Sequence, residues 1–109
     1  MITYNTQTKQ YEIAKDSLET LILCSESNGM YLYMFYCSEV IRQCQNVKTF
    51  DGTCSIDNIT VARRIGWSLS KLNRVKQELI KKEMIEVIVE RNRQLFAKWK
   101  IKVHGLTIK

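Results

Sequence analysis

Polar side chains with hydrogen-bonding groups recur every three or four residues in the segment 68–82. Arginine can form two parallel hydrogen bonds with guanine, asparagine and glutamine can do the same with adenine, and serine and lysine hold phosphates or base edges. At about 100° per residue these side chains share one side of a helix, namely Ser70, Arg74, Gln77 and Lys81, with Lys71 and Asn73 at its edges. Such a face could read the bases of a DNA duplex. The simpler alternative is an ordinary solvent-facing surface.

The opposite side of the same segment is apolar and contains Leu72, Val75, Leu79 and Ile80. This amphipathic pattern predicts a helix from Leu69 to about Lys82 that buries one face. Ser68 is expected to cap its N-terminus and to join the candidate DNA contacts. Lys76 falls inside the apolar arc, so we expect its stem to pack there and its ammonium group to reach out to water.

A second, shorter amphipathic helix is predicted just before this one. Ser55 is a plausible N-cap, and apolar residues then recur at helical spacing, at Ile56, Ile59, Ala62 and Ile65. Gly66 supplies a sharp turn, and Trp67 is expected to fill the corner between the two helices. The segment 55–85 therefore reads as a helix-turn-helix.

After Met84-Ile85 the apolar period changes from helical to two, which predicts a hairpin over residues 86–103. Its tip is placed at residues 91–93, because a three-residue loop keeps both apolar sets on one face. Arg91 and Arg93 at the tip are suited to phosphates or the minor groove. The lysines of the second strand are more simply a solvated face that balances acidic residues of the first; these are Lys98, Lys100 and Lys102 against Glu86 and Glu90.

The first half of the chain looks like scaffold. Residues 1–29 form an N-terminal extension in which Tyr4 and the segment 11–14 flank a polar stretch, suggesting a small hairpin or a strand that joins the later sheet. Asp16 and Glu19 have capping-box spacing, which predicts a short helix over about 17–24. The segment 47–54 is expected to be a turn-rich connection.

Residues 30–46 are predicted to form a long core helix with two apolar stripes. A helix that is apolar around much of its girth must be covered on both sides. The rest of the chain can cover it, or part of it can form a homodimer contact through Tyr31, Tyr33 and Met34.

The positive charge is concentrated in the second half of the chain. The net charge is +6, but residues 1–54 hold four Lys/Arg against six Asp/Glu, and residues 55–109 hold thirteen against five. This is the electrostatic footprint expected for phosphate binding, although a basic run can also be a solvated face.

Several functional classes are not expected. No secretory signal is visible and the longest apolar run, 30–37, is far shorter than the roughly 20 residues of a membrane span, so a cytoplasmic location is expected. The chain has neither a phosphate-binding glycine loop nor an H-E-x-x-H motif, and its sole histidine, His104, has no obvious carboxylate partner. No enzyme, cofactor, metal or small-molecule ligand is therefore predicted, and reduced thiols are expected at Cys24, Cys37, Cys44 and Cys54.

The segment 60–87, TVARRIGWSLSKLNRVKQELIKKEMIEV, resembles the winged-helix core shared by bacterial transcription regulators and by replication-initiation proteins of phages and plasmids. The matching positions are Val61-Ala62, Ile65-Gly66, Ser68, Ser70, Arg74, Leu79 and Met84-Ile85. Glu83 stands where the family pattern usually has a glycine.

The resemblance implies one α+β winged helix-turn-helix domain over residues 1–109, with three to four helices and a C-terminal β-hairpin wing. Together with the polar helix face and the basic second half, it predicts sequence-specific binding to double-stranded DNA, by a transcription regulator or a replication-initiation factor of a phage, plasmid or similar mobile element. Such a protein can act as a homodimer on a two-fold site. The alternative function is a winged-helix module that binds another protein and does not read DNA sequence.

Overall fold

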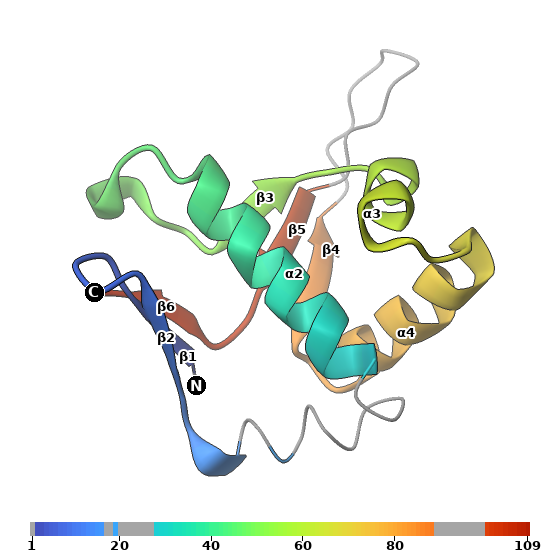
Figure 1. Ribbon diagram of the computed structural model, residues 1–109, viewed down its shortest axis with the longest axis horizontal. Coiled ribbons are helices and arrows are strands. Elements are labelled where there is room, and N and C mark those ends of the chain that lie inside the picture. The colour runs from blue at the N-terminus through green and yellow to red at the C-terminus, as the bar shows by residue number, and fades with distance from the viewer. Residues whose placement is uncertain (1, 17–18, 20–27, 89–99) are drawn as a thin grey trace.

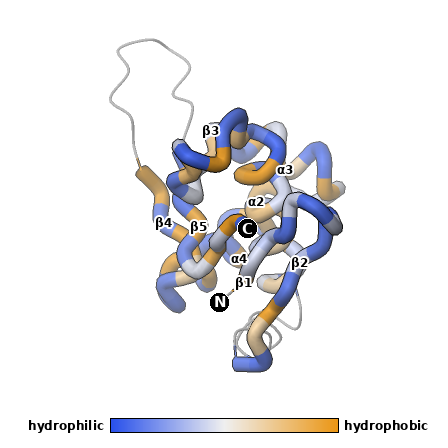
Figure 2. Tube along the Cα trace, turned by 90° about the vertical axis from the view of Figure 1, so that its left-hand side faces the viewer, coloured by the Kyte–Doolittle hydropathy of each residue, from blue (hydrophilic) through white to orange (hydrophobic). Residues whose placement is uncertain are grey.

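The computed structural model describes residues 2–16, 19, 28–88 and 100–109 of the chain. This part is an α+β fold with helices α2 (Asn28–Gln43), α3 (Asn58–Ile65) and α4 (Leu69–Lys81), and a short 3-10 helix, η2 (Val47–Thr49). Within these ranges, six strands form two separate three-stranded sheets (Figure 1). In the view of Figure 2, β4 and β5 of one sheet lie to the left, and β1 and β2 of the other lie to the right.

The first sheet has the order β2-β1-β6, with β1 (Ile2–Asn5), β2 (Gln10–Ile13) and β6 (Leu106–Ile108). The predicted N-terminal hairpin is confirmed, because β1 and β2 pair antiparallel. Its turn is held by Asn5, whose side-chain oxygen accepts hydrogen bonds from the amides of Gln7 and Thr8. The predicted alternative, a strand that joins a later one, holds as well, because β1 also pairs with β6; that this partner is β6 and that the pairing is parallel were not predicted.

The second sheet has the order β3-β5-β4, with β3 (Thr53–Ser55), β4 (Ile85–Ile88) and β5 (Lys100–Val103). Val87 lies opposite Ile101, so the apolar sets share one face as predicted, and Glu86 lies opposite Lys102. The register differs, however. A three-residue loop at 91–93 would pair Ile88 with residue 96 in an uninterrupted ladder, whereas Ile88 pairs with Lys100. The predicted tip residues Arg91 and Arg93 lie outside the described residues.

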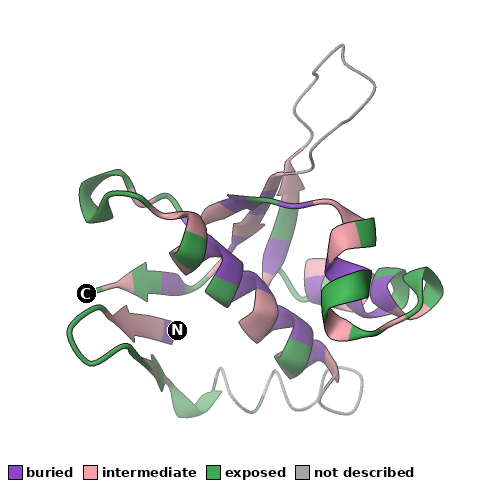
Figure 3. Cartoon of the chain, turned by 45° about the horizontal axis from the view of Figure 1, so that its top comes forward, coloured by how far each residue is buried: buried purple, intermediate pink, exposed green. Residues whose placement is uncertain are grey.

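Helix α2 is the centre of the core and packs against α4, β3 and β5. It begins two residues before the predicted segment and ends at Gln43. Figure 3 shows buried residues along α2 and on the inner side of α4. A single apolar cluster runs through these elements and includes residues from both ends of the chain, Ile2 and Leu106.

Tyr33 does not lie in a surface contact as the dimer prediction required. It is 2% exposed, and its hydroxyl donates a 2.5 Å hydrogen bond to the carbonyl of His104. Met34 is half-buried and Tyr31 is exposed. The prediction was wrong for Tyr33 because its ring is covered by the segment that follows β5, a distant part of the chain that helical spacing does not reveal.

The predicted N-terminus of the helix that precedes Gly66 was also wrong. Ser55 belongs to β3, where it pairs with Lys100, and Asp57 caps α3 instead by accepting a hydrogen bond from the amide of Thr60. Ile56 is buried ahead of the helix, whereas Ile59 is exposed. The predicted connection 47–54 therefore contains η2 and most of β3.

Candidate nucleic-acid interface

The turn between α3 and α4 is built by Gly66, Trp67 and Ser68. Gly66 has φ 71°, in the left-handed region that glycine adopts without a steric penalty. The amide of Trp67 then donates to the carbonyl of Ala62 at 3.1 Å. Ser68 caps α4 as predicted, because its Oγ accepts from the amide of Lys71 at 3.2 Å. The turn thus fixes where α4 begins, and α4 ends one residue before the predicted Lys82.

Helix α4 divides sharply into a buried and an exposed side. Leu72, Val75 and Leu79 are fully buried. The candidate DNA contacts that the sequence placed opposite them are all exposed to solvent; these are Ser70, Asn73, Arg74, Gln77 and Lys81. The structure therefore brings these five predicted residues together on one exposed helix face, which we call the α4 polar face.

Lys71 lies beside this face but is engaged at the turn. Its Nζ lies 4.5 Å from the ring centroid of Trp67, an attractive cation–π arrangement. The same tryptophan packs against Tyr31 of α2, with ring centroids 5.9 Å apart. Lys71 is accordingly half-buried, and Ser68 uses its oxygen as a helix cap, so both predicted contacts have structural roles at the corner.

Lys76 does not reach out to water, contrary to the sequence-based expectation. It is 4% exposed, and its Nζ donates a 2.8 Å hydrogen bond to Oδ1 of Asn58, the first residue of α3. Burial lowers the pKa of this ammonium group. The apolar arc of α4 thus contains a buried polar link to α3.

The α3-turn-α4 segment is strongly basic. Residues 58–82 contain seven Lys/Arg and one acidic residue. Two of the basic residues, Arg63 and Arg64, are exposed on the last turn of α3 and were not among the predicted contacts. An Arg-Arg pair at the end of the first helix was the sequence signal available for them.

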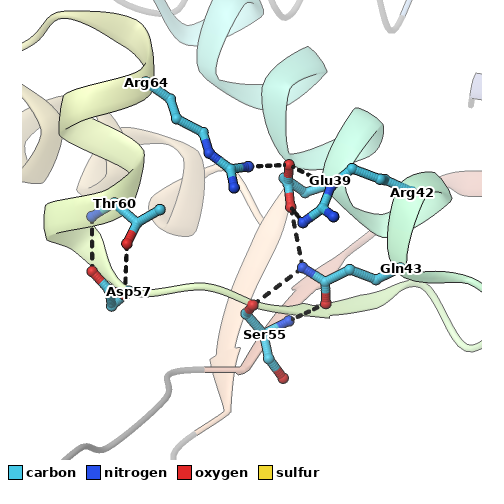
Figure 4. Close-up of polar contacts among 7 residues, drawn as sticks. All are labelled: Glu39, Arg42, Gln43, Ser55, Asp57, Thr60 and Arg64. Carbon is cyan, nitrogen blue, oxygen red and sulfur yellow. Dashed lines mark hydrogen bonds and ion pairs between the residues drawn. The ribbon is translucent and has the colours of Figure 1, made fainter.

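A buried carboxylate in α2 positions α3. Glu39 is 5% exposed, and one of its oxygens accepts a 2.5 Å hydrogen bond from Nη1 of Arg64. Arg42 makes a two-point contact with the same carboxylate, at 3.1 and 2.7 Å. These contacts converge on Glu39 in Figure 4. The hydrogen bonds from Arg42 and the charge of Arg64 hold the pKa of Glu39 below its usual range.

Gln43 extends this network to β3 (Figure 4). Its amide nitrogen donates to Glu39 at 3.1 Å and to the carbonyl of Ser55 at 3.1 Å, and its carbonyl accepts from the amide of Ser55 at 2.8 Å. Asp57, two residues after Ser55, caps α3 by accepting hydrogen bonds from the amide and the hydroxyl of Thr60. The end of β3 and both ends of α3 are therefore fixed by polar side chains that periodicity alone did not reveal.

The described part of the predicted wing lies beside this segment. Lys100 and Lys102 of β5 are half-buried, and Lys102 lies opposite Glu86 as the expected charge balance requires. His104 follows β5, and its Nε2 lies 3.4 Å from Oε2 of Glu86, so it has the carboxylate neighbour that the sequence did not suggest. Lys98, Arg91 and Arg93 fall outside the described residues.

Cys37 and Cys54 are buried free thiols in the core, and burial raises the pKa of each to about 12. Cys44 is a half-buried free thiol, and Cys24 lies outside the described residues. Within the described ranges, no group of three His, Cys, Asp or Glu side chains could hold a metal ion. Nor is any helix there both long enough and apolar enough to span a membrane.

Comparisons with models of known protein families, with curated proteins and with solved structures give no match.

Proposed function

We propose that this chain is a winged helix-turn-helix protein that binds double-stranded DNA sequence-specifically through α4. The observation that carries the proposal is the division of α4 between three fully buried apolar residues and the α4 polar face. A helix held this firmly on one side presents the other as a rigid surface. The side-chain types on that surface are those that pair with base edges in the major groove.

The electrostatics of the neighbouring segment support the same function. Arg63 and Arg64 are exposed at the end of α3, next to the turn that leads into α4. In this arrangement α3 crosses the DNA backbone, where Arg63 neutralises phosphates, while Arg64 keeps its ion pair with Glu39 and α4 enters the groove. Such phosphate contacts strengthen binding to any sequence, and the α4 polar face supplies the preference among sequences.

The α3-turn-α4-hairpin order also supports the winged-helix assignment. Strand β4 begins at Ile85, four residues after α4 ends, and pairs antiparallel with β5. Under the proposal the hairpin is the wing, and Arg91 and Arg93 at its tip grip the backbone beside the groove. The corresponding biological role is a cytoplasmic transcription regulator or a replication-initiation factor of a phage, plasmid or similar mobile element.

The proposal is tested by selecting binders from a randomised duplex library at physiological and at raised salt, followed by sequencing. Enrichment of one motif that persists at raised salt is the expected result, because base contacts depend less on salt than phosphate contacts do. The matched control is a variant with Arg74 and Gln77 both replaced by Ala, which should lose the motif. Weak binding without any motif would overturn the proposal and favour a protein-binding module.

A further inference from the structure

Strand β6 lies at the edge of the first sheet, beside β1. The carbonyl of Gly105 accepts from the amide of Ile2 at 2.7 Å, and the amide of Lys109 donates to the carbonyl of Tyr4 at 2.8 Å. In a parallel ladder alternate residues of a strand direct both backbone groups toward the same neighbour. The backbone groups of Gly105, Thr107 and Lys109 therefore point toward β1. The amides and carbonyls of the residues between them, Leu106 and Ile108, point toward the outer edge of the sheet.

The outer edge of β6 borders a groove of about 480 Å³. One wall is β6 itself, and the other is formed by Val47 of η2 and the segment Phe50–Gly52. The side chain of Val47 is 52% exposed. In Figure 1 the η2 segment lies above β6, and both lie on the opposite side of the molecule from α3 and α4. A further strand that paired with β6 would lie in this groove.

The two edges of this sheet differ in how well they resist pairing. Natural edge strands usually carry charges, prolines or bulges that prevent association. Strand β2 has the exposed Glu12, which is paired with Lys109 at 3.4 Å. Strand β6 reads Leu-Thr-Ile and has no charged residue. Only the β6 edge combines outward backbone groups with a neutral sequence of high strand propensity.

We propose that β6 pairs antiparallel with β6 of a second copy of this chain, forming one continuous sheet across a two-fold axis. Thr107 then faces Thr107 of the partner subunit on the axis, and Leu106 exchanges both backbone hydrogen bonds with Ile108 of the partner subunit. This register uses the outward groups of both strands and places no charged residue opposite a like charge.

The side chains fit this register as well. Thr3 and Thr107 lie on the same face of the sheet, with their hydroxyl oxygens 3.0 Å apart. Pairing across the axis extends this contact into a row of threonines from both copies, and cross-strand threonine pairs are favourable. The basic helices α3 and α4 lie far from β6 (Figure 1), so association does not bring them together. The inference does not depend on the proposed DNA binding.

The first test is the oligomeric state, measured by analytical ultracentrifugation over a range of concentrations. The wild-type chain should form a dimer. Thr107→Lys and Thr107→Glu should each raise the dimer dissociation constant roughly fivefold or more, because like charges then face each other on the axis. An equal mixture of the two variants should restore dimers through Lys–Glu pairs. The control is Gln10→Lys on the exposed β2 edge, which should leave the dimer unchanged.

Amide hydrogen exchange gives a second readout that identifies the contact surface. In the wild-type chain, exchange at Leu106 and Ile108 should slow as concentration rises, whereas Thr107, whose amide faces β1, should be protected at every concentration. Protection of Thr107 in the Lys variant also shows that the variant is folded. A wild-type chain that stays monomeric, a dimer that both charge variants leave intact, or a dimer with fast exchange at Leu106 and Ile108 would overturn the proposal.

Discussion

The ammonium group of Lys76 is hydrogen-bonded to Oδ1 of Asn58, so a buried lysine of α4 is tied to the first residue of α3. A neutral amide oxygen compensates only part of the cost of removing an ammonium group from water. The burial that lowers the pKa of Lys76 therefore also reduces the stability of the folded chain at neutral pH. The link fixes the relative position of the two helices at this cost.

Replacing Lys76 by Met should raise the free energy of unfolding at pH 7 by about 1 kcal/mol, since a packed apolar side chain avoids the desolvation penalty. Because the pKa of Lys76 is lower in the folded than in the unfolded chain, the folded chain binds fewer protons, and wild-type stability rises as pH rises through the folded pKa. The gain from Lys76→Met should therefore shrink in alkaline solution.

Urea unfolding of both proteins at neutral and alkaline pH measures this difference. The matched control is Lys81→Met on the exposed side of the same helix, for which a change within about 0.5 kcal/mol is expected. A destabilised Lys76→Met protein at neutral pH would show that the hydrogen bond to Asn58 outweighs the burial cost.

Arg74→Ala should weaken binding to the selected DNA motif by about 1–3 kcal/mol and relax the preference at one base pair. The reason is that an exposed arginine in the middle of the α4 polar face is suited to two-point pairing with guanine. Fluorescence anisotropy with duplexes substituted at single base pairs measures the effect. Lys48→Ala removes the same charge from η2, on the opposite side of the molecule, and should leave the preference unchanged (Figure 1). An equal loss on every duplex would assign Arg74 to a phosphate contact.

Glu39→Gln should lower the free energy of unfolding at pH 7 by about 2 kcal/mol, because Arg42 and Arg64 lose a charged acceptor that is almost completely buried. The depressed pKa of Glu39 means that its contribution is present above the unfolded value of about 4.3 and is lost as pH falls through the folded pKa. Chemical unfolding at neutral and acid pH should show the two proteins converging in acid. Glu12→Gln, on the exposed edge of β2, is the control.

Glu83→Gly should raise the free energy of unfolding by about 1 kcal/mol, because Glu83 has φ 58° and glycine adopts this left-handed conformation without strain. Gly66→Ala should have the opposite effect by a similar amount. A Cβ at Gly66 meets no atom within 4 Å, so only its backbone conformation, with φ +71°, opposes the change. Thermal unfolding of both variants tests the pair, and a destabilised Glu83→Gly protein would contradict the assignment.

The left-handed backbone of Glu83, just after α4, was not predicted, because a non-glycine residue gives no local signal for it. The helix α4, its Ser68 cap and the Gly66 turn follow from local signals, namely helical periodicity, cap chemistry and glycine conformation. Such signals act within a few residues, so a single sequence is enough to predict them.

The features that escaped prediction depend on distant partners. Ser55 and Asp57 are both good cap residues. Asp57 is the cap because Ser55 belongs to β3, where it pairs with Lys100 of β5. From its type alone Glu39 would be expected to face solvent, and its burial depends on Arg64, which α3 places beside it. Likewise, whether Lys76 meets water or Asn58 depends on the packing of α3 against α4. Periodicity cannot supply this information because it reports on one element at a time.

The pairing of Ile2 with Leu106 sets the order in which the chain can fold during its synthesis. The β1–β2 hairpin is made before α2, α3 and α4, whereas its parallel neighbour β6 is made after them. The hairpin must therefore wait, with one edge unpaired, while α2, α3 and α4 emerge and pack. The first sheet can therefore be completed only after β6 has been made, because this pairing joins residues about a hundred positions apart.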